Sequence, residues 1–125
     1  MEAAAGIILG NKKILLVRRA PGRSFAGSWG FIGGRKEAQE SMNEVVIREV
    51  KEEMNLNFQP TRLFHQGKYG QLDFQLFLGE WNGEIVPQQE EVAEWKWFTY
   101  QEAITLNLVY DTKDILHNLH QEGLL

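Results

Sequence analysis

Three glutamates stand close together in the stretch REVKEEMNL, which runs from Arg48 to Leu56. If this stretch is helical, Glu49, Glu52 and Glu53 share one face, because positions i, i+3 and i+4 meet at 3.6 residues per turn. Like charges at this spacing repel by roughly 0.2–0.5 kcal/mol, and anions at a helix C-terminus oppose its dipole, at about 0.3–1 kcal/mol each. The grouping becomes favourable when it holds a hard divalent cation, for which carboxylate oxygens suit Mg²⁺ or Mn²⁺.

A solvated acidic helix face is the alternative, and it is the usual explanation of an isolated Glu-Glu pair. Here the helix offers few counter-charges, since only Arg48 stands four residues before Glu52 and no basic residue stands four residues from Glu53. Arg48 itself could form an ordinary helix-face ion pair with Glu44, four residues earlier. The poorly compensated charge favours a cation site over a solvated face.

A helix must position these carboxylates. The segment Ser41 to Glu44 has the Ser-x-x-Glu form of a capping box and predicts a helix that begins at Met42. Asn55 predicts its end, because asparagine tolerates the left-handed conformation that closes helices.

Strands and two further helices are expected around it. The patterns predict strands at 6–9 and 14–17 joined by a turn at Gly10-Asn11, and a strand with alternating apolar residues at 72–78. A hairpin is expected at Asn82-Gly83, followed by a strand that contains Trp95 and Trp97. A short helix is expected after the capping box Thr99 to Glu102, and a last helix at about 111–121. This order predicts an α/β fold of the α+β kind, in which helices pack on a mixed β-sheet.

Composition bounds the class of protein. A chain of 125 residues with 43% hydrophobic content fits one domain, residues 1–125, with a buried core. The net charge of -4 argues against binding a nucleic-acid polymer, and the apolar run at 3–9 is too short to cross a membrane. The absence of cysteine favours a cytoplasmic protein. The oligomeric state, including a homodimer, is left open.

The spacing around the predicted helix closely resembles the signature of the Nudix hydrolases, the MutT-like pyrophosphohydrolases. The 23 matching positions begin at a glycine and end at an apolar residue, and the specified polar types fall at Gly34, Glu40, Arg48, Glu49, Glu52 and Glu53. Two positions depart from the pattern: Asn55 stands where the family usually has glycine, and Ile32 where proline commonly precedes the glycine pair. The first change is conservative, because asparagine adopts the same left-handed conformation.

The resemblance implies a Nudix-type α/β/α sandwich and a role for each residue of the signature. It implies that Mg²⁺, or Mn²⁺, is bound by the main-chain carbonyl of Gly33 and by the carboxylates of Glu49, Glu52 and Glu53. Arg48 would orient these carboxylates through charge-assisted hydrogen bonds. Gly34 and Glu40 would lie next to the metal ligands and help to position them, without binding the metal themselves. The general base would be Glu49 or an acidic residue of the segment 88–94, where we favour Glu94 over Glu91.

Substrate contacts are expected ahead of the helix. Arg19 and Arg23 could hold phosphate oxygens, and Phe25 and Trp29 could stack on a base. By elimination among subfamilies, the resemblance implies cleavage of nucleoside triphosphates, normal or oxidised, to a monophosphate and pyrophosphate. Two alternatives remain: a hydrolase of nucleoside diphosphates linked to another group, such as a nucleotide sugar or ADP-ribose, and a Nudix module that binds nucleotides without hydrolysing them.

Overall fold

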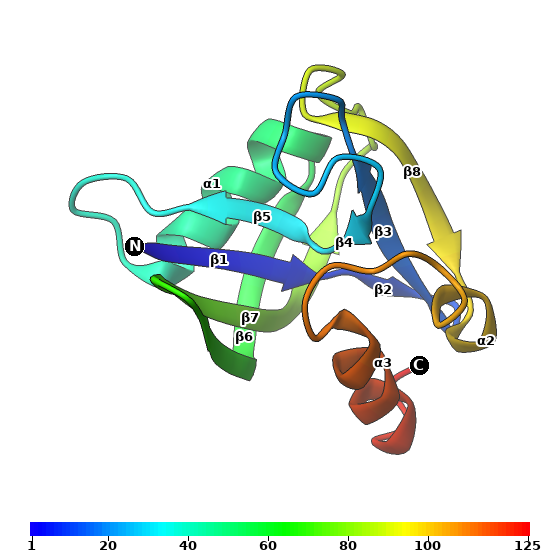
Figure 1. Cartoon of the computed structure of the whole chain (residues 1–125). Helices are drawn as coiled ribbons and strands as arrows, with labels where there is room; N and C mark the ends of the chain where they lie inside the picture. The colour runs from blue at the N-terminus through cyan, green and yellow to red at the C-terminus, as the bar shows by residue number, and fades with distance from the viewer. The chain divides into compact units, whose positions relative to one another are not determined.

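The structure, a computed structural model, describes all residues from 1 to 125. It divides into two compact units, of which the first comprises residues 1–8 and 32–88 and the second residues 9–31 and 89–125. Each unit contains one β-sheet and is described by itself; the elements are labelled in Figure 1.

The first unit is a mixed sheet covered by a helix. Its sheet has the order β5-β1-β7-β6, in which β1 runs parallel to β7 and antiparallel to β5, and β6 pairs antiparallel with β7. The helix α1 contacts β1, β5 and β6 and so covers one face (Figure 1). The elements are β1 Glu2–Ile7, β5 Ile32–Arg35, α1 Met42–Met54, β6 Asn57–Tyr69 and β7 Leu72–Asn82. This arrangement confirms the predicted fold class.

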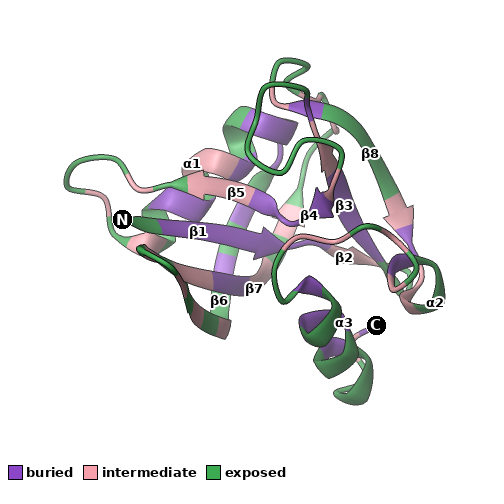
Figure 2. Cartoon of the chain, viewed as in Figure 1, coloured by how far each residue is buried: buried purple, intermediate pink, exposed green.

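Helix α1 begins and ends where the sequence predicts. Both bonds of the capping box form, because the Ser41 hydroxyl accepts from the Glu44 N–H and the Glu44 carboxylate accepts from the Ser41 N–H. Asn55 closes the helix in the left-handed conformation, with φ of 61°. The apolar face of α1 is fully buried in the core, as the purple segments of Figure 2 show, and comprises Val45, Val46, Val50 and Met54.

The C-cap gives a first prediction. Replacing Asn55 by alanine should lower the free energy of unfolding by about 1 kcal/mol, because alanine pays the steric cost of a left-handed backbone. Glycine at the same position should come close to the wild type, since glycine adopts this conformation freely, although the bond from the Asn55 amide to the Glu84 carbonyl is lost. Urea denaturation of the two variants measures the difference, and equal values for both would contradict this account of the cap.

The second unit is a small antiparallel sheet with two helices. Strand β3 lies at its centre and pairs with β2, β4 and β8, and its four residues 14–17 are all buried. The elements are β2 Leu9–Gly10, β3 Lys13–Arg19, β4 Trp29–Gly30, β8 Val92–Phe98, α2 Tyr100–Ala103 and α3 Thr112–Gln121. The capping box at Thr99 and Glu102 forms as predicted, and α3 buries Ile115, Leu116 and Leu119.

Two turns differ from the predictions. The predicted hairpin at Asn82-Gly83 is wrong, because β7 ends there and the next strand, β8, pairs with β3 instead of β7. After Gly83 the chain instead bonds to the end of α1, where the Met54 carbonyl accepts from the Val86 N–H and the Glu53 carbonyl from the Gln88 N–H. Exposed carbonyls at a helix C-terminus need such donors. The first turn falls at residues 11 and 12, one residue later than predicted, where both have positive φ.

None of the three helices combines the length and apolar character that a membrane span requires.

Candidate functional site

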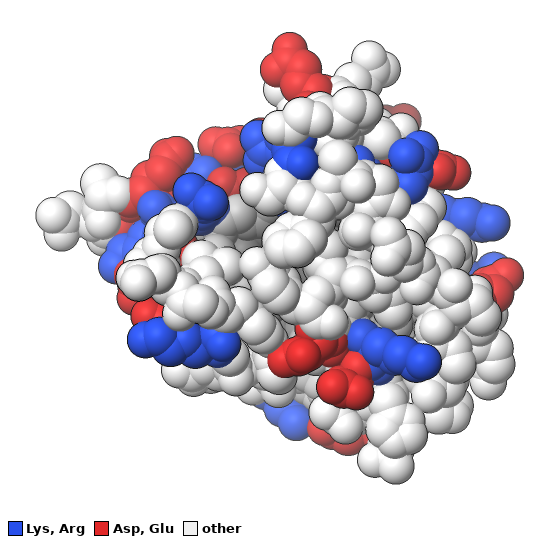
Figure 3. Space-filling view, viewed as in Figure 1, with Lys and Arg blue, Asp and Glu red and all other residues white.

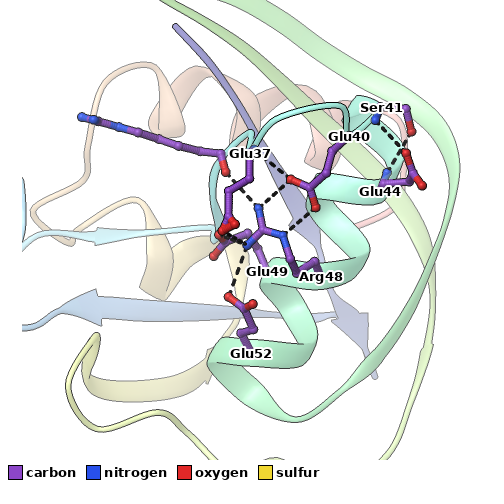
Figure 4. Close-up of polar contacts among 8 residues, drawn as sticks. Glu37, Glu40, Ser41, Glu44, Arg48, Glu49 and Glu52 are labelled. Atoms are coloured by element: carbon purple, nitrogen blue, oxygen red, sulfur yellow. Dashed lines mark hydrogen bonds and ion pairs between the residues drawn. The ribbon is translucent and has the colours of Figure 1, made fainter.

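Arg48 lies at the centre of a network of carboxylates from α1 and from the loop before it (Figure 4). Its Nε and Nη2 donate to the two oxygens of Glu40 at 2.6 and 2.9 Å, a bidentate pair. Its Nη1 donates to Glu49 at 2.8 Å and to Glu52 at 3.3 Å. Its Nη2 also donates to the main-chain carbonyl of Arg35 at 3.0 Å. Arg48 therefore joins the end of β5, the loop before α1 and the acidic face of the helix.

This network differs from the alternative expected for Arg48, an ion pair with Glu44 on the helix face. The arginine forms no helix-face pair with Glu44, whose carboxylate instead accepts from the Ser41 N–H in the capping box. Glu37, which the sequence analysis did not single out, lies 3.6 Å from the guanidinium. Its position in the loop ahead of the helix, three residues before Glu40, was the only available signal. The arginine is thus surrounded by carboxylates on two sides.

The network shifts the pKa of both members of its bidentate pair. The hydrogen bond from Arg48, aided by the Glu37 N–H, lowers the pKa of Glu40 from 4.5 to about 2. The hydrogen bond to Glu40 raises the pKa of the Arg48 guanidinium above its ordinary value. Both groups therefore stay charged throughout the neutral range.

The lowered pKa of Glu40 predicts a pH dependence of stability. Because the pKa is lower in the folded than in the unfolded chain, this contribution is fully present above about pH 4.5 and is lost as the pH falls towards 2. The free energy of unfolding should fall more steeply in this window for the wild type than for Glu40→Gln, whose amide does not titrate. Denaturant titrations from pH 6 to pH 2 measure the two slopes, and identical slopes would contradict the pairing.

Glu49 and Glu53 form the compact acidic pair of the first unit. Glu53 is only 5% exposed, and one of its carboxylate oxygens lies within 4.8 Å of a carboxylate oxygen of Glu49. Burying one carboxylate beside another is costly unless a cation compensates them. Glu52 is different, since its side chain is 54% exposed and bonds to Arg48. The hard oxygen donors of Glu49 and Glu53 fit a divalent cation such as Mg²⁺ or Mn²⁺.

The glycine pair of β5 lies against this acidic group. Strand β5 pairs Gly33 with Ala5 and Gly34 with Ala4 of β1. A methyl group on Gly33 would collide with the main-chain oxygen of Ala4, whereas one on Gly34 would come within 2.6 Å of both carboxylate oxygens of Glu49. Gly34 therefore leaves the space that the Glu49 carboxylate occupies.

These contacts predict opposite results at the two glycines. Gly34→Ala should lower activity about tenfold while changing the free energy of unfolding by less than about 1 kcal/mol, because the flexible end of Glu49 can move aside but then leaves its position. Gly33→Ala should lower the free energy of unfolding by about 1–3 kcal/mol, because its neighbour is main chain and cannot yield. Thermal unfolding and initial rates measured for both variants test this contrast.

The residues of the second unit that were predicted to contact substrate or act as a base form ion pairs or stabilise a loop. Arg18 pairs with Glu94 at 3.1 Å, and Arg23 pairs with Glu91 at 3.8 Å. Arg19 donates to the main-chain oxygen of Ser24 at 2.8 Å and so closes the loop between β3 and β4. The roles of Glu94 as base and of Arg19 and Arg23 as phosphate ligands stay predictions.

The two aromatic candidates differ in exposure. Trp29 is 9% exposed and packs edge to face on Phe98, with ring centroids 5.0 Å apart, as a core residue does. Phe25 is 47% exposed and packs against Tyr110, a residue that the sequence analysis missed. Of the two, only Phe25 presents its ring to solvent.

Known proteins resemble this chain in sequence and in fold. A family model described as the NUDIX domain matches residues 1–119, a range that includes parts of both units. The 8-oxo-dGTP diphosphatase of Escherichia coli (strain K12) is 31% identical over 101 residues, covering 76% of this chain and 78% of the relative. The NAD-capped RNA hydrolase NudC of Mannheimia succiniciproducens is 35% identical over 98 residues, covering 74% of this chain. The CTP pyrophosphohydrolase of Escherichia coli (strain K12) is 39% identical over 56 residues, covering 45% of this chain.

The chain spans only 37% of the NudC protein and 42% of the CTP pyrophosphohydrolase. Among solved structures, the MutT protein of Methanosarcina mazei Go1 matches with a TM-score of 0.85 and 22% identity over 98% of this chain and 94% of that one. The MutT NUDIX hydrolase of Burkholderia pseudomallei matches with a TM-score of 0.83 and 22% identity over 93% and 95%. These structural matches show the fold, and the family model shows the family: the chain belongs to the Nudix hydrolases.

Proposed function

We propose that this chain is a Mg²⁺-dependent hydrolase that cleaves the pyrophosphate link of nucleoside triphosphates to a monophosphate and pyrophosphate. The observation that carries the proposal is the buried carboxylate of Glu53 beside Glu49, on a helix in which Arg48 holds Glu49 and Glu52. A non-catalytic module would have no need to keep this costly arrangement of charge.

The residues of the first unit have complementary tasks. Glu49, Glu52, Glu53 and the Gly33 carbonyl would hold the metal, which when bound neutralises phosphate charge and lowers the pKa of water. Arg48 keeps Glu49 and Glu52 in place through hydrogen bonds to their oxygens. Glu49 would accept the proton of the attacking water, a role for which Glu94 is the alternative.

The named relatives support nucleotide substrates. The relative that this chain spans most fully among the three compared is a diphosphatase of 8-oxo-dGTP, and another is a pyrophosphohydrolase of CTP, so both names specify triphosphates. A second candidate is a nucleoside diphosphate linked to another group, which the resemblance to a hydrolase of NAD-capped RNA favours, because NAD is itself a diphosphate joining two nucleosides. The two candidates share the same metal chemistry.

The expected partner is a small nucleotide. Lys and Arg side chains are interspersed with Asp and Glu on the face shown in Figure 3, and the net charge is -4, which favours a small anion held through a cation over a nucleic-acid polymer. We place the protein in the cytoplasm, in line with its lack of cysteine. The carboxylates of α1 come from a single chain, so the proposal requires no homodimer.

Product analysis tests the proposal. A panel of dNTPs, NTPs, 8-oxo-dGTP, ADP-ribose and nucleotide sugars is incubated with Mg²⁺, with Mn²⁺ and with EDTA. Metal-dependent release of pyrophosphate from triphosphates is the expected result, because only triphosphates yield inorganic pyrophosphate in one cleavage. Turnover of the diphosphate conjugates alone would establish the second candidate, and tight nucleotide binding without turnover of any compound would identify a binding module.

A further inference from the structure

Strand β8 forms an open edge of the sheet in the second unit. It pairs with β3 on one side and with no strand on the other. Its residues 93–96 are all exposed, Trp95 by 37%, and Figure 2 shows most of the strand in green. An open strand edge presents main-chain donors and acceptors with which another strand can pair.

Hydrogen bonds at the end of β3 show which of its residues bond towards β8. The Arg19 N–H donates to the carbonyl of Ser28, just ahead of β4, at 3.0 Å. The next N–H, that of Ala20, donates to the carbonyl of Glu91, just ahead of β8, at 3.2 Å. Because the bonding direction alternates along a strand, the even-numbered residues of β3 bond towards β8.

The main-chain groups of Trp95 therefore point to the open edge. The even-numbered residues Leu16 and Arg18 of β3 lie opposite Lys96 and Glu94 of β8. These two residues of β8 thus direct their main-chain groups to β3. Trp95 stands between them, so by the same alternation its N–H and C=O are directed away from β3.

The open edge of the other sheet differs from β8. Strand β6 is the last strand of its sheet, and its register with β7 shifts twice. It contains Pro60 and two basic residues, Arg62 and Lys68. Proline, irregular register and charges of one sign all prevent a strand edge from pairing with another copy. From Glu94 to Phe98, β8 has a regular register, no proline and one charge of each sign.

The charges of β8 are complementary to those of its own sequence read in the opposite direction. Opposite residues of an antiparallel pair share one face of the sheet, so a two-fold symmetric pair of β8 strands must be centred on a single residue. Centring on Trp95 places Glu94 opposite Lys96 of the second copy, and the same pair recurs by symmetry. Centring on Lys96 or on Glu94 would place two like charges opposite each other. Opposite charges across a strand pair stabilise it, so the charges select the register centred on Trp95.

Contacts within the chain orient both charged side chains without using all their capacity. One oxygen of Glu94 accepts from Arg18 Nε at 3.1 Å, while the side chain is 50% exposed. The Lys96 ammonium lies 5.6 Å from the centre of the Phe98 ring, a contact that uses none of its hydrogen-bond donors. A carboxylate has two acceptor oxygens and an ammonium three donors, so each group can also bind a partner.

We propose that β8 pairs antiparallel with β8 of a second copy of this chain, with the two-fold axis at Trp95. The two copies of Trp95 exchange main-chain hydrogen bonds, and their exposed indoles meet beside the axis. The short strand gives a small interface, so the dimer is weak and its population rises with protein concentration. The dimer is independent of the proposed hydrolysis, whose carboxylates lie on α1 in the first unit.

Sedimentation equilibrium of the full chain, from micromolar to millimolar concentration, measures the dissociation constant of the dimer. Glu94→Lys and Lys96→Glu should each raise this constant about tenfold or more, because both symmetry-related pairs then join like charges. The double variant with both substitutions restores opposite charges at each pair and should dimerise nearly as the wild type does.

Mixing the two single variants tests the register directly. Neither should dimerise well alone, but in the mixture each variant strand faces opposite charges on the other, so a heterodimer should form. The matched controls are Glu80→Lys on β7 and Lys68→Glu on β6, which make the same changes of charge at exposed positions. Both controls should dimerise as the wild type does.

A main-chain substitution tests the pairing without a change of charge. Trp95→Pro removes the N–H at the axis and should abolish the dimer, whereas Trp95→Val keeps the N–H and should weaken the dimer less. Because this N–H points away from β3, proline breaks no hydrogen bond within the sheet. The melting temperatures of the two variants should therefore be similar, which separates loss of pairing from loss of folding.

Three results would each overturn the β8 interface. They are a wild type that stays monomeric at every concentration, a dimer that neither charge reversal weakens, and a mixture of the single variants that dimerises no better than each alone. Hydrolysis is not used as a readout, because Glu94 is also the alternative general base. A failed dimer therefore leaves the proposed hydrolysis untouched, and a protein that dimerises through β8 but hydrolyses no nucleotide would refute only the hydrolysis.

Discussion

Glu53→Gln should abolish metal-dependent hydrolysis while leaving the fold intact. Glu53 is 5% exposed and lies beside Glu49, so an amide at this position keeps the shape of the side chain but removes its negative charge. Loss of groups that merely orient metal ligands costs 10–100-fold in activity, so loss of a ligand itself should reduce the rate by about a hundredfold or more. Because a buried charge is costly, stability without metal should be unchanged or higher.

The measurement combines rates with thermal unfolding. In the wild type, Mg²⁺ or Mn²⁺ should raise the melting temperature, since a ligand that binds only the folded state stabilises it. In Glu53→Gln this increase should be small or absent. Glu80→Gln is the matched control, because it makes the same change at an exposed position on β7 and should behave as the wild type in both assays. Full activity of Glu53→Gln would falsify the metal site.

Arg48→Met should reduce both activity and stability, in contrast to Glu53→Gln. The substitution keeps much of the side-chain volume but removes every hydrogen bond to Glu40, Glu49 and Glu52. Hydrogen bonds to charged groups are each worth about 1.5–3 kcal/mol, and part of the network is exposed to solvent, so the free energy of unfolding should fall by about 2 kcal/mol. Activity should fall about 10–100-fold, because the carboxylates lose their orientation.

Arg48→Lys separates charge from geometry. Lysine keeps the positive charge, but its single ammonium cannot reproduce the bidentate pair with Glu40 together with the bonds to Glu49 and the Arg35 carbonyl. We therefore expect Lys to restore part of the stability and little of the activity. Urea denaturation and initial rates measure the two quantities, and a lysine variant as active as the wild type would show that charge alone is sufficient.

Local patterns in the sequence were enough to define α1 and its chemistry-bearing face. The capping box at Ser41 and the left-handed Asn55 were predicted, and the structure confirms both limits of the helix. These features depend on neighbours within four or five residues, so the chain between them contains all the information required. The 3.6-residue period also predicts which glutamates share a face, although their roles in catalysis stay predictions.

Pairing between distant strands could not be predicted in this way. The Asn82-Gly83 signal correctly indicates a turn, but a turn does not specify which strand the following segment joins. That choice depends on partners remote in sequence: β1 pairs with β7 some 70 residues later, and β8 pairs with β3 from the other end of the chain. Such contacts are selected by burial of whole faces, which no short pattern encodes.

The family signature, the helix that carries it and the class of metal that its carboxylate oxygens suit could be predicted from the sequence alone. The burial and the partners of these residues follow from the tertiary structure. In the structure, Arg48 pairs with Glu40 instead of Glu44. Glu53 is buried, whereas Glu52 is exposed. Phe25 packs against Tyr110, which lies 85 positions later in the chain. The reason is physical: side-chain type and local period are properties of neighbouring residues, whereas burial and partnership arise only when distant segments pack together.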